Sequence, residues 1–220
     1  MKIIIPMLDT PFVIYDDRIN QIVFEGASDM YSFVFELYQQ LNKMDGNIVI
    51  SEDEKVLDVS KVVDLTTNYF PFDFNRKSII TKLQSRLRDI AIKEMYFETN
   101  ELLSSVSGFI ATLSDSVDGD IEYDDLDIST LLKVSNIRFC VESESLEEQI
   151  IDYCKNVIMI LGDRLFVFVS LRNYLSGLAY ERFKKMIIDN KIKVLLIESF
   201  ERTRSDWENT IIIDEDMCVI

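Results

Sequence analysis

Two charged segments in the middle of the chain carry the residue types best suited to chemistry. The first is acidic and consists of Asp118, Asp120, Glu122, Asp124 and Asp125. Carboxylate oxygens are hard ligands that suit Ca²⁺, which accepts many oxygens in flexible geometry, but the spacing is not that of an EF-hand. From these residues alone, a solvated acidic loop leading to a helix N-cap at Asp127 is the simpler interpretation, and calcium binding is the alternative.

The second segment is basic and lies between residues 75 and 93. Its cations are Arg76, Lys77, Lys82, Arg86, Arg88 and Lys93. With one acid, Asp89, the stretch has a formal charge of +5. On a helix, Lys82, Arg86 and Lys93 share a face. Such a face either binds phosphates or stays solvated and balances nearby acids, and the residues leave both interpretations open.

The composition excludes several classes of site. The 220 residues include 23 Lys and Arg, 39 Asp and Glu, and no histidine, so the formal net charge is −16. Without histidine there is no Ser-His-Asp triad and no histidine zinc ligand. The three cysteines, Cys140, Cys154 and Cys218, are far apart, which is typical of reduced thiols in the cytosol. No apolar run is long enough to span a bilayer, so we expect a soluble, cytoplasmic protein with no membrane partner.

The elements of the C-terminal half alternate between strand and helix. Apolar runs predict strands over Ile137–Val141, Leu165–Val169 and Val194–Ile197, with later strands over Thr210–Ile213 and Met217–Ile220. A helix follows the capping box Ser145–Glu148 and ends at Gly162, and another covers Gly177–Asn190. Uninterrupted hydrophobic strands are typical of parallel sheets covered on both faces. The predicted fold class is therefore α/β.

The N-terminal half contains the place where a phosphate-binding loop would be expected. Strands are predicted over Lys2–Met7, Pro11–Tyr15, Gln21–Glu25 and Asn47–Ser51, and a helix over Asp29–Lys43 with Ser28 as its N-cap. The strand-to-helix turn at Gly26 is short, has one glycine and is followed by no lysine. Nucleotide hydrolysis is therefore disfavoured, because the turn lacks the backbone amides and the cation that cradle phosphates.

Residues 73–113 show no strand pattern. One helical seam is formed by Leu83, Leu87 and Ile90, and a second by Leu102, Val106, Phe109 and Leu113. We expect residues 1–72 and 128–220 to form an α/β core domain, and residues 73–127 to form a helical insertion with an acidic hinge.

Several segments, taken in order along the chain, resemble one known family. They are Met7–Ile14, Gly119–Lys133, Leu165–Ser170, Val194–Glu198 and Ile213–Asp216. In this order they resemble the CRISPR-associated spacer-adaptation proteins of type II-A systems, the Csn-two family. The resemblance implies a degenerate P-loop-ATPase-like core sheet with an inserted α-helical arm, which agrees with the missing phosphate loop at Gly26.

The resemblance also implies a function that is not enzymatic. Members form homotetrameric rings that bind double-stranded DNA ends in a basic channel during spacer acquisition, alongside the integrase pair and the effector nuclease. Their calcium ions lie at the hinge, so calcium becomes the favoured interpretation for residues 118–125, and Lys133 falls on a matching lysine. The basic residues of 76–93 do not match the family one by one and rest on charge alone. The alternatives are a metal-dependent nuclease that uses Asp118–Asp125 and a purely protein-binding scaffold.

Overall fold

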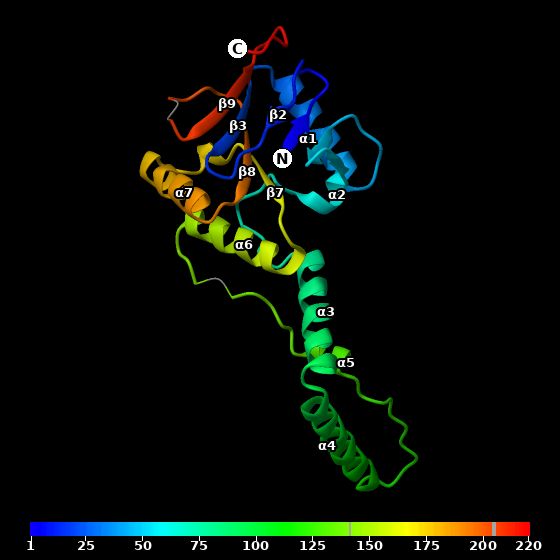
Figure 1. The fold of residues 1–220 in the computed structure, drawn as a ribbon. Coiled ribbons are helices and arrows are strands. Elements are labelled where there is room, and N and C mark those ends of the chain that lie inside the picture. The colour runs from blue at the N-terminus through cyan, green and yellow to red at the C-terminus, as the bar shows by residue number, and fades with distance from the viewer. Residues whose placement is uncertain (141, 204–205) are drawn as a thin grey trace. The chain divides into compact units, whose positions relative to one another are not determined.

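The structure is a computed structural model that describes residues 1–140, 142–203 and 206–220. The chain forms two units (Figure 1): an α/β unit of Met1–Asp73, Val141–Ile158 and Gly162–Ile220, and a helical unit of Phe74–Cys140 with Met159–Leu161. The chain enters the helical unit at Phe74, and the sequence prediction placed this boundary at residue 73. It leaves that unit only after Cys140, so residues 128–140 lie in the helical unit and not in the core domain to which the prediction assigned them.

A five-stranded sheet forms the centre of the α/β unit. Its strands, in spatial order, are β6 (Val63–Thr66), β7 (Leu165–Val169), β8 (Lys193–Glu198), β3 (Ile19–Phe24) and β9 (Glu208–Ile213). All pairs are parallel, and Gln21 lies opposite Leu196 on one side and Thr210 on the other. The predicted parallel α/β sheet is therefore confirmed. Strand β6 was not predicted, because its four residues are too few for a pattern and include Asp64.

The N-terminal strands form a second, antiparallel sheet. Its order is β2 (Phe12–Val13), β1 (Lys2–Ile4), β4 (Val49–Glu52) and β5 (Lys55–Leu57). Strands β1 and β2 are shorter than the sequence predicted. The side chains of Ile3 and Ile50, which face each other across β1 and β4, are fully buried and join the core of the unit.

Helices cover the two faces of the parallel sheet. They are α1 (Ala27–Leu41), α2 (Val59–Val62), α6 (Leu146–Leu161) and α7 (Gly177–Asp189), with a 3₁₀ turn η1 (Leu171–Asn173). Alternate residues of β7 point to opposite faces. Val167 belongs to the core that contains Phe33 of α1. On the other face, the ring of Phe166 lies 6.3 Å from Tyr153 of α6, and that of Phe168 lies 6.3 Å from Phe183 of α7.

The helix ends show which local predictions hold. The Ser145 side chain accepts a hydrogen bond from the Glu148 amide, and Gly162 ends α6 with a φ of 84°, as expected. The N-cap of α1 is Gly26 and not Ser28, and it makes no side-chain cap.

The strand predicted over Ile137–Val141 does not form at 137–140, and Val141 lies outside the described residues. The reason is a side chain that takes the place of a strand partner. Asn75 Oδ1 accepts from the Phe139 amide at 2.8 Å, and Asn75 Nδ2 donates to the Phe139 carbonyl at 3.1 Å. The segment Met217–Ile220, also predicted as a strand, makes a single bridge between Val219 and Ile213.

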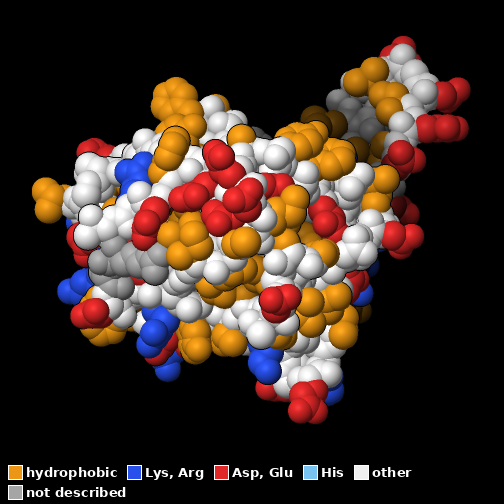
Figure 2. All heavy atoms as spheres, turned by 90° about the horizontal axis from the view of Figure 1, so that it is seen from above, with side chains coloured by type: hydrophobic (Ala, Val, Ile, Leu, Met, Phe, Trp, Pro, Cys, Tyr) orange, Lys and Arg blue, Asp and Glu red, His pale blue; other side chains and the backbone are white. Residues whose placement is uncertain are grey.

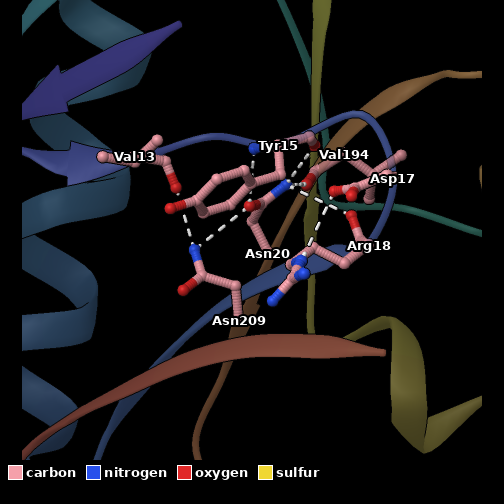
Figure 3. Close-up of polar contacts among 7 residues, drawn as sticks. All are labelled: Val13, Tyr15, Asp17, Arg18, Asn20, Val194 and Asn209. Atoms are coloured by element: carbon pink, nitrogen blue, oxygen red, sulfur yellow. Dashed lines mark hydrogen bonds and ion pairs between the residues drawn. The ribbon is translucent and has the colours of Figure 1, made fainter. Parts of the chain in front are cut away.

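The fully buried strand β3 contains a polar residue, Asn20, that is satisfied on all sides (Figure 3). Its Oδ1 accepts from the Tyr15 amide at 2.9 Å, and its Nδ2 donates to the carbonyls of Tyr15 and Val194, each at 2.9 Å. Since a buried polar group without a partner is costly, this network is what allows an asparagine in the centre of the sheet.

The helical unit consists of α3 (Lys77–Lys93), α4 (Tyr96–Asp115) and α5 (Ile128–Val134). Helices α3 and α4 were predicted, and α5 packs against α3 as a third. Ile79 is the one buried residue among those described in this unit, and α4 has none. Within the part of the chain that the structure describes, no helix is both long and apolar enough to cross a bilayer.

Candidate nucleic-acid and metal-binding segments

The basic residues of the sequence prediction begin at the first turn of α3. Arg76 is the N-cap residue, with no side-chain cap, and Lys77 is the first helical residue. Both follow directly on Asn75, whose amide is fixed by the Phe139 backbone. A cation at a helix N-terminus opposes the helix dipole, so these two cations gain nothing from the helix itself. Positions where a residue goes against a local preference, as these two cations go against the helix dipole, are often functional.

Three further cations lie along one face of α3, and all three are exposed. Arg86 Nη1 donates to the Met159 carbonyl at 2.5 Å, and Lys93 lies 3.7 Å from Asp89. Lys82 occupies the same face. An exposed pair such as Lys93–Asp89 contributes little and opens easily, so this face keeps its ability to meet an anion.

Helix α5 brings Lys133 to the side of α3 that carries Arg88. Asp127 caps α5, and its Oδ1 accepts from the Thr130 amide at 2.6 Å, as the sequence predicted. This hydrogen bond lowers the pKa of Asp127, and the nearby charges of Lys133 and Arg88 lower it further. Arg88 and Lys133, which are 45 positions apart in the sequence, therefore act on the same carboxylate.

The acidic segment lies between α4 and α5, and all its predicted ligands are exposed. It was predicted to lie at the hinge, but it lies within the helical unit, because α5 packs against α3 before the chain returns to the α/β unit. Among the described residues, no three acidic or cysteine side chains converge as metal ligands. The donor atoms suit Ca²⁺, but in this arrangement Asp118, Asp120, Glu122, Asp124 and Asp125 form no preformed cage.

The turn at Gly26 is filled by the protein itself. A Cβ atom built on Gly26 would clash with Oδ2 of Asp29, so this carboxylate covers the start of α1. A negative charge therefore already occupies the place where a phosphate would meet the helix N-terminus. This agrees with the absence of a phosphate-loop sequence.

Two lysines of the α/β unit are held in ion pairs. Lys184 contacts Glu181 at 2.8 Å and Glu208 at 3.5 Å. Lys193 contacts Glu52 at 2.8 Å and Asp163 at 2.7 Å. These contacts give both lysines a structural role, whereas the cations of α3 are mostly exposed.

Comparison with known proteins identifies the family. The family model described as CRISPR-associated protein (Cas_Csn2) matches residues 40–217. A CRISPR-associated protein Csn2 from Streptococcus agalactiae is 26% identical over 184 residues, which cover 80% of this chain and 79% of that protein.

One solved structure shows the same fold at low sequence identity. A crystal structure of a Streptococcus thermophilus protein has a TM-score of 0.58 with 12% identity, and the match covers 97% of this chain and 74% of that one. An ABC-transporter ATP-binding protein of Pyrococcus furiosus has a TM-score of only 0.37 with 11% identity, over 91% of this chain and 88% of that one, and it does not establish an ATPase-like core. Because the family match extends over most of the sequence, the chain belongs to the Csn2 family of CRISPR-associated proteins, which acts in the adaptation step of type II-A systems.

Proposed function

We propose that the chain binds double-stranded DNA without sequence preference, as a non-catalytic clamp on DNA ends during spacer acquisition. The observation that carries the proposal is the basic helix α3 in a chain with a net charge of −16. Since the overall charge would repel DNA, only a segregated basic surface can attract it.

The cations of this surface come from both sides of the helix. Lys82, Arg86 and Lys93 follow one face, and Arg88 lies with Lys133 of α5. Contacts of lysine and arginine with phosphates carry no information about base sequence, so this binding is sequence-independent, and because the contacts release counterions, salt weakens it. Arg76 and Lys77 add charge at the start of the helix.

A homotetrameric ring is part of the proposal. Helix α4 carries an apolar stripe that includes Leu102, Phe109 and Leu113, and Phe109 is 63% exposed. An apolar face of this size on a helix with no buried residue is typical of a surface that another protein covers. Association through α4 would join several basic helices around one duplex.

Calcium is proposed as the cofactor of this assembly, bound by the carboxylates of 118–125 once the segment closes around the ion. The metal would offset the mutual repulsion of these acids and order the connection between α4 and α5. The integrase pair and the effector nuclease are the proposed protein partners, which process the DNA that the clamp holds.

The proposal is tested with linear and covalently closed circular DNA of the same sequence in a mobility-shift assay with Mg²⁺ present. We expect retention of the linear form, weak binding of the circle and no cleavage of either. The variant Lys82→Glu/Arg86→Glu should lose binding, and Lys155→Glu/Lys185→Glu, which reverses two exposed cations of the α/β unit, should retain it. Equal binding of both DNA forms would contradict end binding, and cleavage would favour a nuclease.

A further inference from the structure

The carboxyl ends of the five parallel strands lie along one edge of the sheet in the α/β unit. In a parallel sheet all carboxyl ends meet at one edge, where α/β proteins usually bind their ligands. Hydrogen bonds fix the start of two turns to the neighbouring strand: the Glu25 amide, after β3, donates to the Ile213 carbonyl of β9 at 2.9 Å, and the Ser170 amide, after β7, donates to the Ile197 carbonyl of β8 at 2.7 Å. The exposed residues of the turns that follow the five strands are here called the carboxyl-edge surface.

The half of this surface over β6, β7 and β8 is aromatic. Phe70 follows β6, Tyr174 follows β7 and Phe200 follows β8, with exposed fractions of 89%, 58% and 66%. The centre of the Tyr174 ring lies 5.0 Å from that of the Tyr69 ring. Because Tyr69 is buried, this contact restricts the position of Tyr174. Aromatic side chains such as tyrosine are enriched among the few residues that carry most of the binding energy in protein interfaces.

The half over β3 and β9 is acidic. Glu25 follows β3, and Glu215 and Asp216 follow β9; all three are exposed. Asp214, the first residue after β9, accepts from the amides of Asp216 at 2.9 Å and Cys218 at 2.7 Å, and this fixes the turn that presents the acids. Their charges add to that of Asp29 over the start of α1.

Two arginines in the described part of these turns, Arg172 and Arg202, have partners of their own. The guanidinium of Arg172 lies 4.2 Å from the centre of the Tyr180 ring, and Arg202 Nη2 donates to Asn173 Oδ1 at 2.7 Å. Figure 2 views the α/β unit from the end where the C-terminus lies in Figure 1. It shows acidic side chains gathered among hydrophobic ones, with lysine and arginine mostly toward the margin. Negative charge here repels nucleic acid and attracts a basic protein.

We infer that the carboxyl-edge surface docks a lysine- or arginine-rich segment of a partner protein, with the cations over the β3–β9 half and apolar side chains over Tyr174 and Phe200. The charge pattern selects this occupant, because a second copy of the same acidic surface would be repelled. The inference deepens the proposed function and rests on it, since a DNA clamp needs a separate surface for the proteins that process the DNA. Helix α3 and the carboxyl-edge surface thus attract opposite charges.

The test measures binding of the full chain to the purified integrase pair and to the effector nuclease of the same CRISPR system. We expect at least one of them to bind. Glu215→Lys/Asp216→Lys and, separately, Phe200→Ser should each weaken that complex about tenfold, because each removes charge or apolar contact from an exposed position without disturbing the core. Carbodiimide, which joins carboxylates to amines in contact, should link Glu215 or Asp216 to a partner lysine.

The matched control is Asp45→Lys/Asp189→Lys. Asp45 follows α1 and Asp189 ends α7, and both helices run back from their strands to the opposite edge of the sheet. This variant should change partner affinity by less than about twofold. Binding that none of the variants alters, or no binding of either protein by the unaltered chain, would overturn the inference.

Two further measurements on the same preparations keep the outcomes separate. A changed molecular mass of Glu215→Lys/Asp216→Lys would show that a second copy covers the surface and would also overturn the inference. DNA affinity should be unchanged in Phe200→Ser, because Phe200 does not belong to α3 and its replacement leaves the net charge of the chain as it is. Failure of the unaltered chain to bind DNA would count against the proposed function, and the partner measurement would still report on docking by itself.

Discussion

The side chains of Asn20 and Asn209 form a hydrogen bond between neighbouring strands, in which Asn209 Nδ2 donates to Asn20 Oδ1 at 3.2 Å. Asn209 also donates to the Val13 carbonyl at 2.8 Å, and Asn20 donates to the Val194 carbonyl of β8 (Figure 3). One asparagine therefore connects β3 to both of its neighbours in the sheet and to the loop that precedes it.

Asn20→Ala should lower the free energy of unfolding by about 3 kcal/mol, because the Val194 carbonyl and the Tyr15 amide would lose their buried partner. Urea denaturation measures this directly. Asn100→Ala, at an exposed position of α4 where the side chain bonds only to the carbonyl of Tyr96, should change stability by less than about 0.5 kcal/mol. Equal effects of the two substitutions would contradict the role assigned to the Asn20 network.

The sequence predicts the parts of the fold that long apolar patterns determine. Strands β7 and β8 are each almost wholly apolar, and helix α6 combines a capping box with an apolar stripe, so all three were predicted within a few residues. Strand β6 was missed because its neighbours in the sheet, and not its own four residues, make it a strand. The strand expected at Ile137 is absent because Asn75, 62 residues earlier, provides the bonds that a strand partner would provide.

Lys77→Gln/Lys82→Gln should reduce the slope of log affinity against log salt concentration by about 2, since each neutralised phosphate contact removes about one unit. Fluorescence anisotropy with a short duplex at several salt concentrations measures the slope. Lys155→Gln/Lys185→Gln removes the same charge from the α/β unit and should leave the slope unchanged. An unchanged slope in the α3 variant would remove these lysines from the DNA-binding surface.

Asp127→Asn should tighten DNA binding about threefold. Asparagine caps a helix as well as aspartate does, so α5 keeps its start while the charge between Arg88 and Lys133 disappears. Asp127→Ala serves as the comparison, because it removes both charge and cap and should also lower the melting temperature. If Asp127→Asn binds DNA no better than the unaltered chain, Arg88 and Lys133 do not face the duplex.

Glu198→Gln should stabilise the protein, and increasingly so as the pH rises above about 4.5. Burial raises the pKa of Glu198 above its usual value, so the folded state holds the proton more tightly than the unfolded chain does. The contribution of Glu198 to stability is therefore greatest below the unfolded pKa and is lost as the pH rises through the folded pKa. Melting temperatures at pH 5 and pH 8 test this, and a variant that gains equally at both would contradict it.

Glutamine at position 198 can still accept the hydrogen bond that the Arg172 amide donates to the Glu198 carboxylate at 3.0 Å. Glu201→Gln, three residues later and exposed, is the matched control. It should show no comparable change with pH.

Removal of calcium by a chelator should lower the melting temperature if the segment 118–125 binds the ion, because a ligand that binds only the folded state stabilises it. Asp120→Asn/Asp124→Asn should abolish the difference between calcium and chelator while leaving the chelated protein equally stable. Asp16→Asn/Asp17→Asn, which removes two exposed acids of the α/β unit, should keep the full calcium response. A melting temperature that calcium does not change would contradict the proposed cofactor.

The candidate site was less predictable from sequence than the fold. The charge of residues 76–93 is visible in the sequence, but the closeness of Arg88 and Lys133 depends on the packing of α5, which has only seven residues. The carboxyl-edge surface could not be found by pattern, because its residues follow five different strands and only the sheet order brings them together. Phe200 follows β8 and Glu215 follows β9. The two residues belong to one surface because β8 and β9 pair with the two sides of β3.

The position of β3 in the sheet has a consequence for folding during synthesis on the ribosome. Its partners β8 and β9 are made last, and the bond between Asn20 and Val194 joins residues 174 positions apart. On the ribosome, β3 must therefore remain without its neighbours until the last segments have emerged, while the local contacts of α3, α4 and α5 can form on the way. Loss of β9 alone leaves β3 open on one side, and loss of β8 as well leaves it without any partner, so we expect a chain that ends early to be bound by chaperones and degraded by proteases.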